Sequence, residues 1–137
     1  MASILAVDDE RDIVDLVKFT LEKQGHRVSQ AYSGVQALEM LGIEPANPNA
    51  LKPDLIVLDV MMPAVSGYTV ASRLLENPRT SSIPIIFLTA KEQVLELSQM
   101  SPNVKEYIVK PFDPGILRET IAQVLARSSA SSDHPSR

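Results

Sequence analysis

The sequence of 137 residues contains no cysteine and only two histidines, His26 and His134. Disulfide bonds and thiolate metal sites are therefore excluded, and two histidines so far apart cannot build a histidine-rich metal site. Any metal ion that this chain binds would be held by oxygen ligands, which favours magnesium, calcium or manganese.

Long apolar runs and basic clusters are also missing. No run reaches the roughly 18 apolar residues of a membrane-spanning helix, and the start, MASILAVDDE, becomes acidic before a signal-peptide core could form. The formal net charge of −4 argues against direct nucleic-acid binding. These features predict a cytoplasmic protein, and a hydrophobic content of 45% fits one domain with a real core.

Five short apolar segments alternate with helical patterns. The expected strands are 3–7, 26–31, 54–58, 83–89 and 106–109. Such alternation, with central strands apolar on both faces, is typical of an α/β fold in which helices cover both sides of a parallel sheet.

Periodicity and end signals predict the helices. The first ends at Gly25, the second opens on Ser33 with Gln36 in a capping-box pattern, and the third runs from about Gly67 to Glu76. A short fourth helix is expected within 91–100, and the last begins at Asp113. The second helix is expected to bury an inner face made of Val35, Ala37, Leu38 and Leu41. The inner face of the last helix is expected to be Ile116, Leu117, Ile121, Val124 and Leu125.

Two stretches lack these patterns. Residues 42–53 contain three prolines and are expected to form an extended loop. Residues 127–137 are rich in serine and without periodicity, so the domain is expected to span 1–126 and to be followed by a disordered tail or the start of a linker.

Polar residues follow the expected strands. Asp8 and Asp9 end the first, Asp59 the third, Thr89 the fourth and Lys110 the fifth. Because the carboxyl ends of parallel strands meet at one edge of the sheet, three carboxylates, a hydroxyl and an ammonium group are expected to lie together.

This combination suits phosphoryl transfer. Three neighbouring carboxylates raise one another's pKa unless a cation lies among them, and magnesium would remove that conflict. Lys110 and Thr89 could then hold phosphate oxygens, and Asp59 could be the nucleophile that forms an aspartyl phosphate.

Each residue also has an ordinary structural interpretation. Asp8 and Asp9 could cap the first helix, and Asp59 could be a loop aspartate. Thr89 suits a strand end, and most lysines are solvated surface charges. Only their coincidence at one edge favours the chemical interpretation.

Four motifs in order, AVDDE, DLIVLDVMMPAVSGY, PIIFLTAK and EYIVKPF, resemble the receiver domain of two-component response regulators. The resemblance covers about residues 3–126. It implies a flavodoxin-like (βα)5 doubly wound sheet of five parallel strands in the order 2-1-3-4-5.

The resemblance also implies a phosphorelay function. Asp59 would accept a phosphoryl group from a phosphohistidine of a sensor histidine kinase or histidine phosphotransfer protein. Magnesium, or manganese in its place, would be bound directly by Asp9 and Asp59, largely through water by Asp8, and by the backbone carbonyl of Met61. The chain would be a phosphoacceptor signalling protein and not an enzyme in the strict sense.

The switch is expected from the same resemblance. Thr89 and Lys110 would contact the phosphoryl group, the Lys110–Pro111 bond would be cis, and Tyr107 would be the switch aromatic. Moving inward, Thr89 and Tyr107 would remodel the face formed by the helix within 91–100, the strand 106–109 and the last helix. That face would bind a downstream protein target, in a monomer or in a phosphorylation-dependent dimer, away from membranes.

Met61 and Lys91 occupy positions that tune the lifetime of the phosphoryl group in the family. An apolar Met61 side chain cannot orient an attacking water, which predicts slow self-dephosphorylation. The departures from the family pattern are Ser66 instead of aspartate, the pair Asn103 and Val104 before the last strand, the long 42–53 loop and a short 90–105 segment.

Three alternatives remain open. The chain could be a receiver trimmed from a longer regulator, since no DNA-binding or catalytic output domain is expected after residue 126. It could be a degenerate receiver that works without phosphorylation, which the intact five-residue set disfavours. A hydrolase of the haloacid dehalogenase type would need an acid two residues after its nucleophile, where this chain has Met61.

Overall fold

The structure is a computed structural model that describes residues 2–91 and 101–132. Its helices and strands follow one another along the chain as β1 (Ser3–Val7), α1 (Arg11–Glu22), β2 (Arg27–Ala31), α2 (Gly34–Met40), β3 (Leu55–Asp59), α3 (Gly67–Glu76), β4 (Ile85–Ala90), β5 (Val104–Lys110) and α4 (Pro114–Ser132). All neighbouring strands are parallel, and their order is β2-β1-β3-β4-β5. The predicted flavodoxin-like order 2-1-3-4-5 is therefore confirmed.

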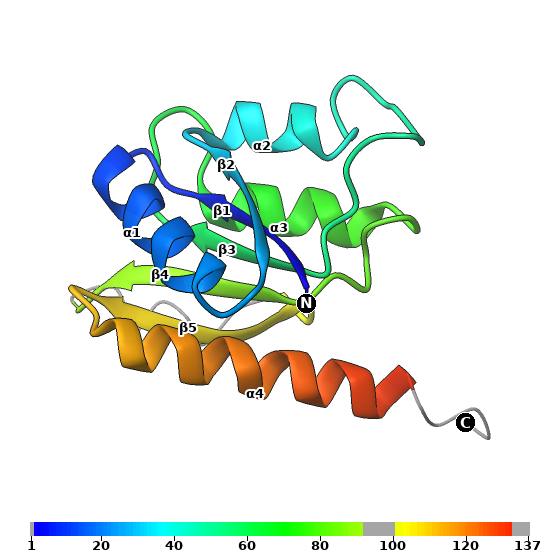
Figure 1. Ribbon diagram of the computed structural model, residues 1–137. Coiled ribbons are helices and arrows are strands. Elements are labelled where there is room, and N and C mark those ends of the chain that lie inside the picture. Colours follow the sequence, from blue (N-terminus) through cyan, green and yellow to red (C-terminus); the bar gives the residue numbers. More distant parts are fainter. Residues whose placement is uncertain (1, 92–100, 133–137) are drawn as a thin grey trace.

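Helices cover both faces of the sheet, with α1 and α4 on one side and α2 and α3 on the other (Figure 1). The alternation of side chains along a strand divides the core accordingly. In β1, Leu5 and Val7 pack on the α2 and α3 side, whereas Ile4 and Ala6 pack on the α1 and α4 side. Burial on both faces explains why the central strands are apolar throughout.

The predicted helix ends agree with the structure in two places. Ser33 is the N-cap of α2, and its hydroxyl accepts a hydrogen bond from the Gln36 backbone N–H at 3.0 Å. Helix α3 spans the expected residues, with Ser66 as its N-cap. The helix expected within 91–100 lies mostly outside the described residues, which resume at 101.

Two residues expected on inner helix faces are exposed. Val35 and Ile116 keep 57% and 51% of their surface in contact with solvent. Both lie in the first turn of their helices, on the side turned to solvent, whereas Ala37 and Leu38 in α2 and the neighbouring Leu117 in α4 are buried. The prediction of burial was therefore wrong at these two positions.

The last helix is longer than the sequence suggests. Helix α4 continues to Ser132, although disorder was expected from residue 127. An ion pair of 3.1 Å between the Arg127 guanidinium and the Glu106 carboxylate joins the helix to β5 at that point. Alanine is the best helix former and serine lowers helix propensity only slightly, so the helix can extend beyond its apolar face. The described part of the chain therefore has no break at residue 127.

The 42–53 segment is a loop, as predicted, and Arg79 fastens it. The guanidinium of Arg79 donates hydrogen bonds to the backbone carbonyls of Leu41 and Ala50, which lie at the start and near the end of the loop. Gly42 has a φ of 72°, a left-handed conformation that glycine adopts without strain. The loop leads from the end of α2 to the start of β3, so it lies at the end of that strand opposite Asp59. None of the described helices is both long and apolar enough to cross a membrane.

Candidate functional site

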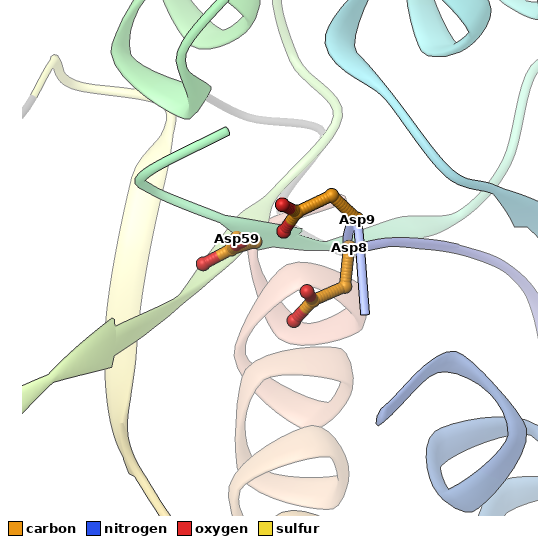
Figure 2. A group of neighbouring side chains, drawn as sticks. All are labelled: Asp8, Asp9 and Asp59. Atoms are coloured by element: carbon orange, nitrogen blue, oxygen red, sulfur yellow. The ribbon is translucent and has the colours of Figure 1, made fainter. Parts of the chain in front are cut away.

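Three carboxylates meet at the carboxyl edge of the sheet. Val7 of β1 pairs with Leu58 of β3, so the next residues, Asp8 and Asp59, emerge side by side. One oxygen of each of Asp8, Asp9 and Asp59 lies within 4.8 Å of the others, and the side chains extend from the two strand ends into the same space (Figure 2). The register of the central strands thus builds the predicted acidic cluster.

Lys110 completes the cluster from the end of β5. Its Nζ lies 2.9 Å from Asp8 Oδ2 and 3.3 Å from Asp59 Oδ1. The peptide bond that follows, Lys110–Pro111, is cis, as the resemblance implied. Asp8 has a second contact, because its Oδ1 accepts a hydrogen bond of 2.9 Å from the Glu10 backbone N–H at the N-cap of α1. The N-cap of α1 is Glu10, and its side chain makes no capping hydrogen bond, so Asp8 contacts the start of the helix without being its cap.

Burial governs the charges of these groups. Asp8 and Asp59 are only 1% and 4% exposed. Burial, together with the charge of Asp8, raises the pKa of Asp59 to about 7 despite Lys110. Burial also raises the pKa of Asp8. For Lys110 burial alone lowers the pKa, but the hydrogen bond to Asp8 and the charge of Asp59 outweigh it and raise the pKa. The site has more negative charge than its one lysine can balance.

An open cleft of about 480 Å³ gives access to the cluster. Asp9, Asp59 and Lys110 line it together with Met61, whose side chain is 55% exposed. Glu10 also lines the cleft and lies 3.7 Å from Lys110 Nζ. Glu10 is not among the site residues predicted from the sequence, although its place directly after the acidic pair was the available signal.

The remaining predicted site residues, Thr89, Tyr107 and Lys91, are not among the residues that line the cleft. Thr89 is the second-last residue of β4, next to Leu88, which pairs in register with Asp59. It is fully buried, and its hydroxyl donates a hydrogen bond of 3.2 Å to the carbonyl of Ala90. Tyr107 lies on β5, is 40% exposed and pairs in register with Phe87. Lys91 follows β4 and is exposed. The structure therefore has Thr89 buried near the end of β4 and Tyr107 partly exposed on β5.

The carboxylates fit a hard divalent cation. Magnesium prefers oxygen ligands and keeps several water molecules, so a partly open group of three carboxylates suits it. Two of the three are buried and carry raised pKa values, which is the conflict that a bound cation would remove. The donor set therefore matches the metal that the sequence analysis predicted.

The turn after Asp59 contains a strained residue that offers a test of stability. Ala64 has a φ of 68°, which costs an L-residue about 1 kcal/mol relative to glycine. We expect Ala64→Gly to raise the free energy of unfolding, with the relief of strain reduced by the greater entropy of the unfolded chain to roughly 0.5 kcal/mol. Urea unfolding followed by circular dichroism measures the change. A loss of stability would show that the Ala64 side chain makes contacts worth more than the strain.

Comparison with known proteins gives consistent matches. Over 127 residues the chain is 39% identical to the DNA-binding dual master transcriptional regulator RpaA of Synechocystis, covering 92% of this chain and 48% of that protein. It is 41% identical to the transcriptional regulatory protein YvrH of Bacillus subtilis, covering 96% of this chain and 52% of the relative. The chain thus spans about half the length of these curated relatives.

Solved structures share the fold. The chemotaxis response regulator CheY4 of Vibrio cholerae matches with a TM-score of 0.77 and 30% identity, covering 90% of this chain and 98% of that one. A response regulator receiver domain protein from Clostridium thermocellum matches with a TM-score of 0.79 and 28% identity, covering 95% and 98%. The sequence model of the response regulator receiver domain matches residues 4–122. The chain therefore belongs to the response regulator receiver domain family of two-component signalling proteins.

Proposed function

We propose that this receiver accepts a phosphoryl group on Asp59. The observation that carries the proposal is the position of Asp59, a nearly buried carboxylate that lines an open cleft, 3.3 Å from the Nζ of Lys110 and within the acidic cluster. A carboxylate held among charged groups at the base of a cleft is suited to nucleophilic attack on phosphorus.

Asp9, Asp59 and the backbone carbonyl of Met61 would hold magnesium directly, or manganese in its place, and Asp8 would act largely through water. When bound, the ion neutralises charge on the phosphoryl oxygens and on the carboxylates. Asp8 is the most buried member of the cluster and is hydrogen-bonded to both Glu10 and Lys110, so its own task is to fix the lysine.

The donor of the phosphoryl group would be a phosphohistidine. An oxygen of Asp59 forms the new bond to phosphorus while the bond between phosphorus and the imidazole nitrogen breaks, and the nitrogen keeps the electron pair. Lys110, which is positioned by Asp8, contacts a phosphoryl oxygen with its ammonium group. The partner that supplies the group is a histidine kinase or a histidine phosphotransfer protein.

Phosphorylation would then move one side chain on β4 and one on β5 and so change the surface that β5 and α4 form. The Thr89 hydroxyl turns from the Ala90 carbonyl toward the phosphoryl oxygens, and Tyr107 moves inward from its exposed position. The face that includes β5 and α4, with the helix expected within 91–100, binds the downstream protein in a monomer or a phosphorylation-dependent dimer. We place this action in the cytoplasm, as for two-component regulators in general.

This receiver is not expected to bind nucleic acid directly. One relative is named as DNA-binding, and this chain covers about half of it. The receiver itself has a net charge of −4, which supports a role without direct contact to DNA.

The main rival activity is hydrolysis by a haloacid dehalogenase mechanism. That chemistry needs an acid two residues beyond the nucleophile, and the structure has the exposed thioether of Met61 there. The degenerate-receiver alternative is disfavoured by the ion pairs that Lys110 makes with both Asp8 and Asp59. Switching by phosphorylation therefore remains the function best supported.

Incubation with acetyl phosphate and magnesium tests the proposal. The intact mass of the wild type is expected to rise by one phosphoryl group, and Asp59→Asn is expected to stay unmodified under the same conditions. Asp54, an exposed-loop aspartate whose carboxylate bonds the Ser3 backbone N–H, provides the matched control Asp54→Asn, which should be labelled like the wild type. Equal labelling of Asp59→Asn and the wild type would refute the proposal.

Met61 provides a prediction about the lifetime of the phosphoryl group. Its side chain lines the cleft but cannot hydrogen-bond a water, so Met61→Asn should speed self-dephosphorylation about tenfold, the value of one added hydrogen bond. The decay of the phosphorylated mass after removal of acetyl phosphate measures the rate. Val35→Asn, a polar change at another exposed apolar residue, is the control. An unchanged rate in Met61→Asn would mean that Met61 does not limit water attack.

A further inference from the structure

Helix α3 begins against the backbone of Asp59. The Gly67 backbone N–H donates a hydrogen bond of 2.7 Å to the carbonyl of Val60. A Cβ placed on Gly67 would lie 2.3 Å from the carbonyl oxygen of Asp59 and 2.9 Å from the Cα of Val60. Both distances are far below van der Waals contact, and both neighbours are backbone atoms that no side-chain rotation can move away.

The Asp59–Val60 segment cannot retreat from such a clash without cost. On its other side the Val60 backbone N–H donates a hydrogen bond of 3.0 Å to the carbonyl of Leu88 in β4. Asp59 itself pairs in register with Leu88. The backbone that carries the Asp59 carboxylate is therefore held between β4 and the first residue of α3.

We propose that Gly67 is a positioning residue for Asp59. By having no side chain, it lets the first turn of α3 close directly on the Asp59 carbonyl and so sets the distance from the carboxylate to Lys110 and to the other two aspartates. This inference rests on the proposed function for its kinetic consequence, but the geometry of the acidic cluster is affected whether or not Asp59 is phosphorylated. Gly67 is not among the described residues with positive φ, so alanine there would act through its volume alone.

Two other residues make matched controls. Gly115 lies in the first turn of α4, where an added Cβ would have no neighbour closer than 3.4 Å, from the side chain of Asp113. Ser66 is the N-cap of α3, and its hydroxyl accepts a hydrogen bond of 3.3 Å from the Thr69 backbone N–H. Gly115→Ala therefore tests a first-turn glycine that has room, and Ser66→Ala loosens the same turn as Gly67→Ala without adding an atom.

The experiment measures two quantities well below the unfolding temperature of each variant. Magnesium affinity is measured by titration calorimetry, and the rate of phosphorylation by acetyl phosphate is measured at saturating magnesium. We expect Gly67→Ala to weaken magnesium binding about tenfold or more and to slow phosphorylation about 100-fold, because a displacement of the order of 1 Å in a reacting group has such an effect. Gly115→Ala and Ser66→Ala should stay within about twofold of the wild type in both quantities.

Several outcomes would overturn the inference. Wild-type affinity and rate in Gly67→Ala would show that the Asp59 backbone does not depend on Gly67. An equal loss of magnesium affinity and phosphorylation rate in Ser66→Ala would show that general loosening of the turn, and not the added Cβ, causes the effect. Should Gly67→Ala be unfolded, the substitution is repeated in the Ala64→Gly background, and failure to fold there too would make Gly67 a residue of global stability only. If the wild type takes no phosphoryl group, the proposed function fails, while the magnesium titration still tests the positioning.

Discussion

Replacing Lys110 with methionine should slow phosphorylation by acetyl phosphate about 100-fold to 1,000-fold, the usual effect of removing one charged or hydrogen-bonding group from a transition state. The Nζ of Lys110 is the cationic group nearest to the Asp59 carboxylate among the described ion pairs, at 3.3 Å. No other described lysine or arginine forms an ion pair with Asp8 or Asp59 that could replace it. The rate is read from the growth of the phosphorylated mass at saturating magnesium.

The same substitution should also lower stability. Without Lys110, two buried carboxylates lose their partner, and breaking a buried ion pair from one side costs about 3 kcal/mol. Urea unfolding of the metal-free protein near neutral pH measures this loss. Saturating magnesium should recover part of it, since binding to the folded state alone stabilises that state.

Two further variants separate charge from geometry. Lys105 lies on the same strand but is exposed, and its Nζ donates to the Pro102 carbonyl, so Lys105→Met should change neither the rate nor the stability appreciably. Lys110→Arg keeps the charge but replaces a compact ammonium by a larger planar group. It should therefore keep a larger share of the wild-type stability than of the wild-type phosphorylation rate. A folded Lys110→Met variant that is phosphorylated at the wild-type rate would exclude Lys110 from the reaction.

Asp59→Asn is expected to stabilise the metal-free protein by roughly 2–4 kcal/mol near pH 8. The pKa of Asp59 in the folded state is raised from its ordinary 3.8 to about 7, mainly by burial. A carboxyl group with a raised folded-state pKa contributes stability that is fully present below the unfolded pKa and lost as the pH rises through the folded one. Asparagine carries no charge, so the variant avoids this loss.

The pH dependence gives this prediction its sign. The difference in unfolding free energy between Asp59→Asn and the wild type should be small near pH 4 and should grow to its full size between pH 4 and about pH 7. Magnesium should then reduce the difference at high pH, because it removes the repulsion only where Asp59 is charged. A difference that is constant with pH, or an unstable variant at pH 8, would show that Asp59 is not destabilised by its charge.

The central sheet could be predicted from the sequence because its signals are redundant. The run Leu55–Leu58 is apolar throughout, as a strand buried on both faces requires, and it ends at Asp59, where the strand reaches the open edge. Since the carboxyl ends of parallel strands share one edge, Asp8, Asp59 and Lys110 had to meet there. Strand order itself came from the family resemblance and not from periodicity.

Features that depend on exact distances could not be predicted. An apolar residue at helical spacing is indistinguishable in sequence from a buried one, so the exposure of Val35 and Ile116 appeared only in the structure. The extension of α4 is accompanied by a long-range ion pair between Arg127 and Glu106, a contact between residues far apart in the sequence that no local pattern records. The proposed role of Gly67 depends on the close approach of its backbone to that of Asp59, eight residues earlier, where an added Cβ would clash and which no local pattern records.

Locating the phosphoryl group tests the account most directly. After treatment of the wild type with acetyl phosphate and magnesium, peptide fragmentation should place one hydroxylamine-labile phosphoryl group on Asp59, and omission of magnesium should abolish the labelling. The location follows from the cleft, whose lining includes Asp59 and Lys110 but not Asp8. Labelling of another residue, or labelling of Asp59 that is independent of magnesium, would contradict the account.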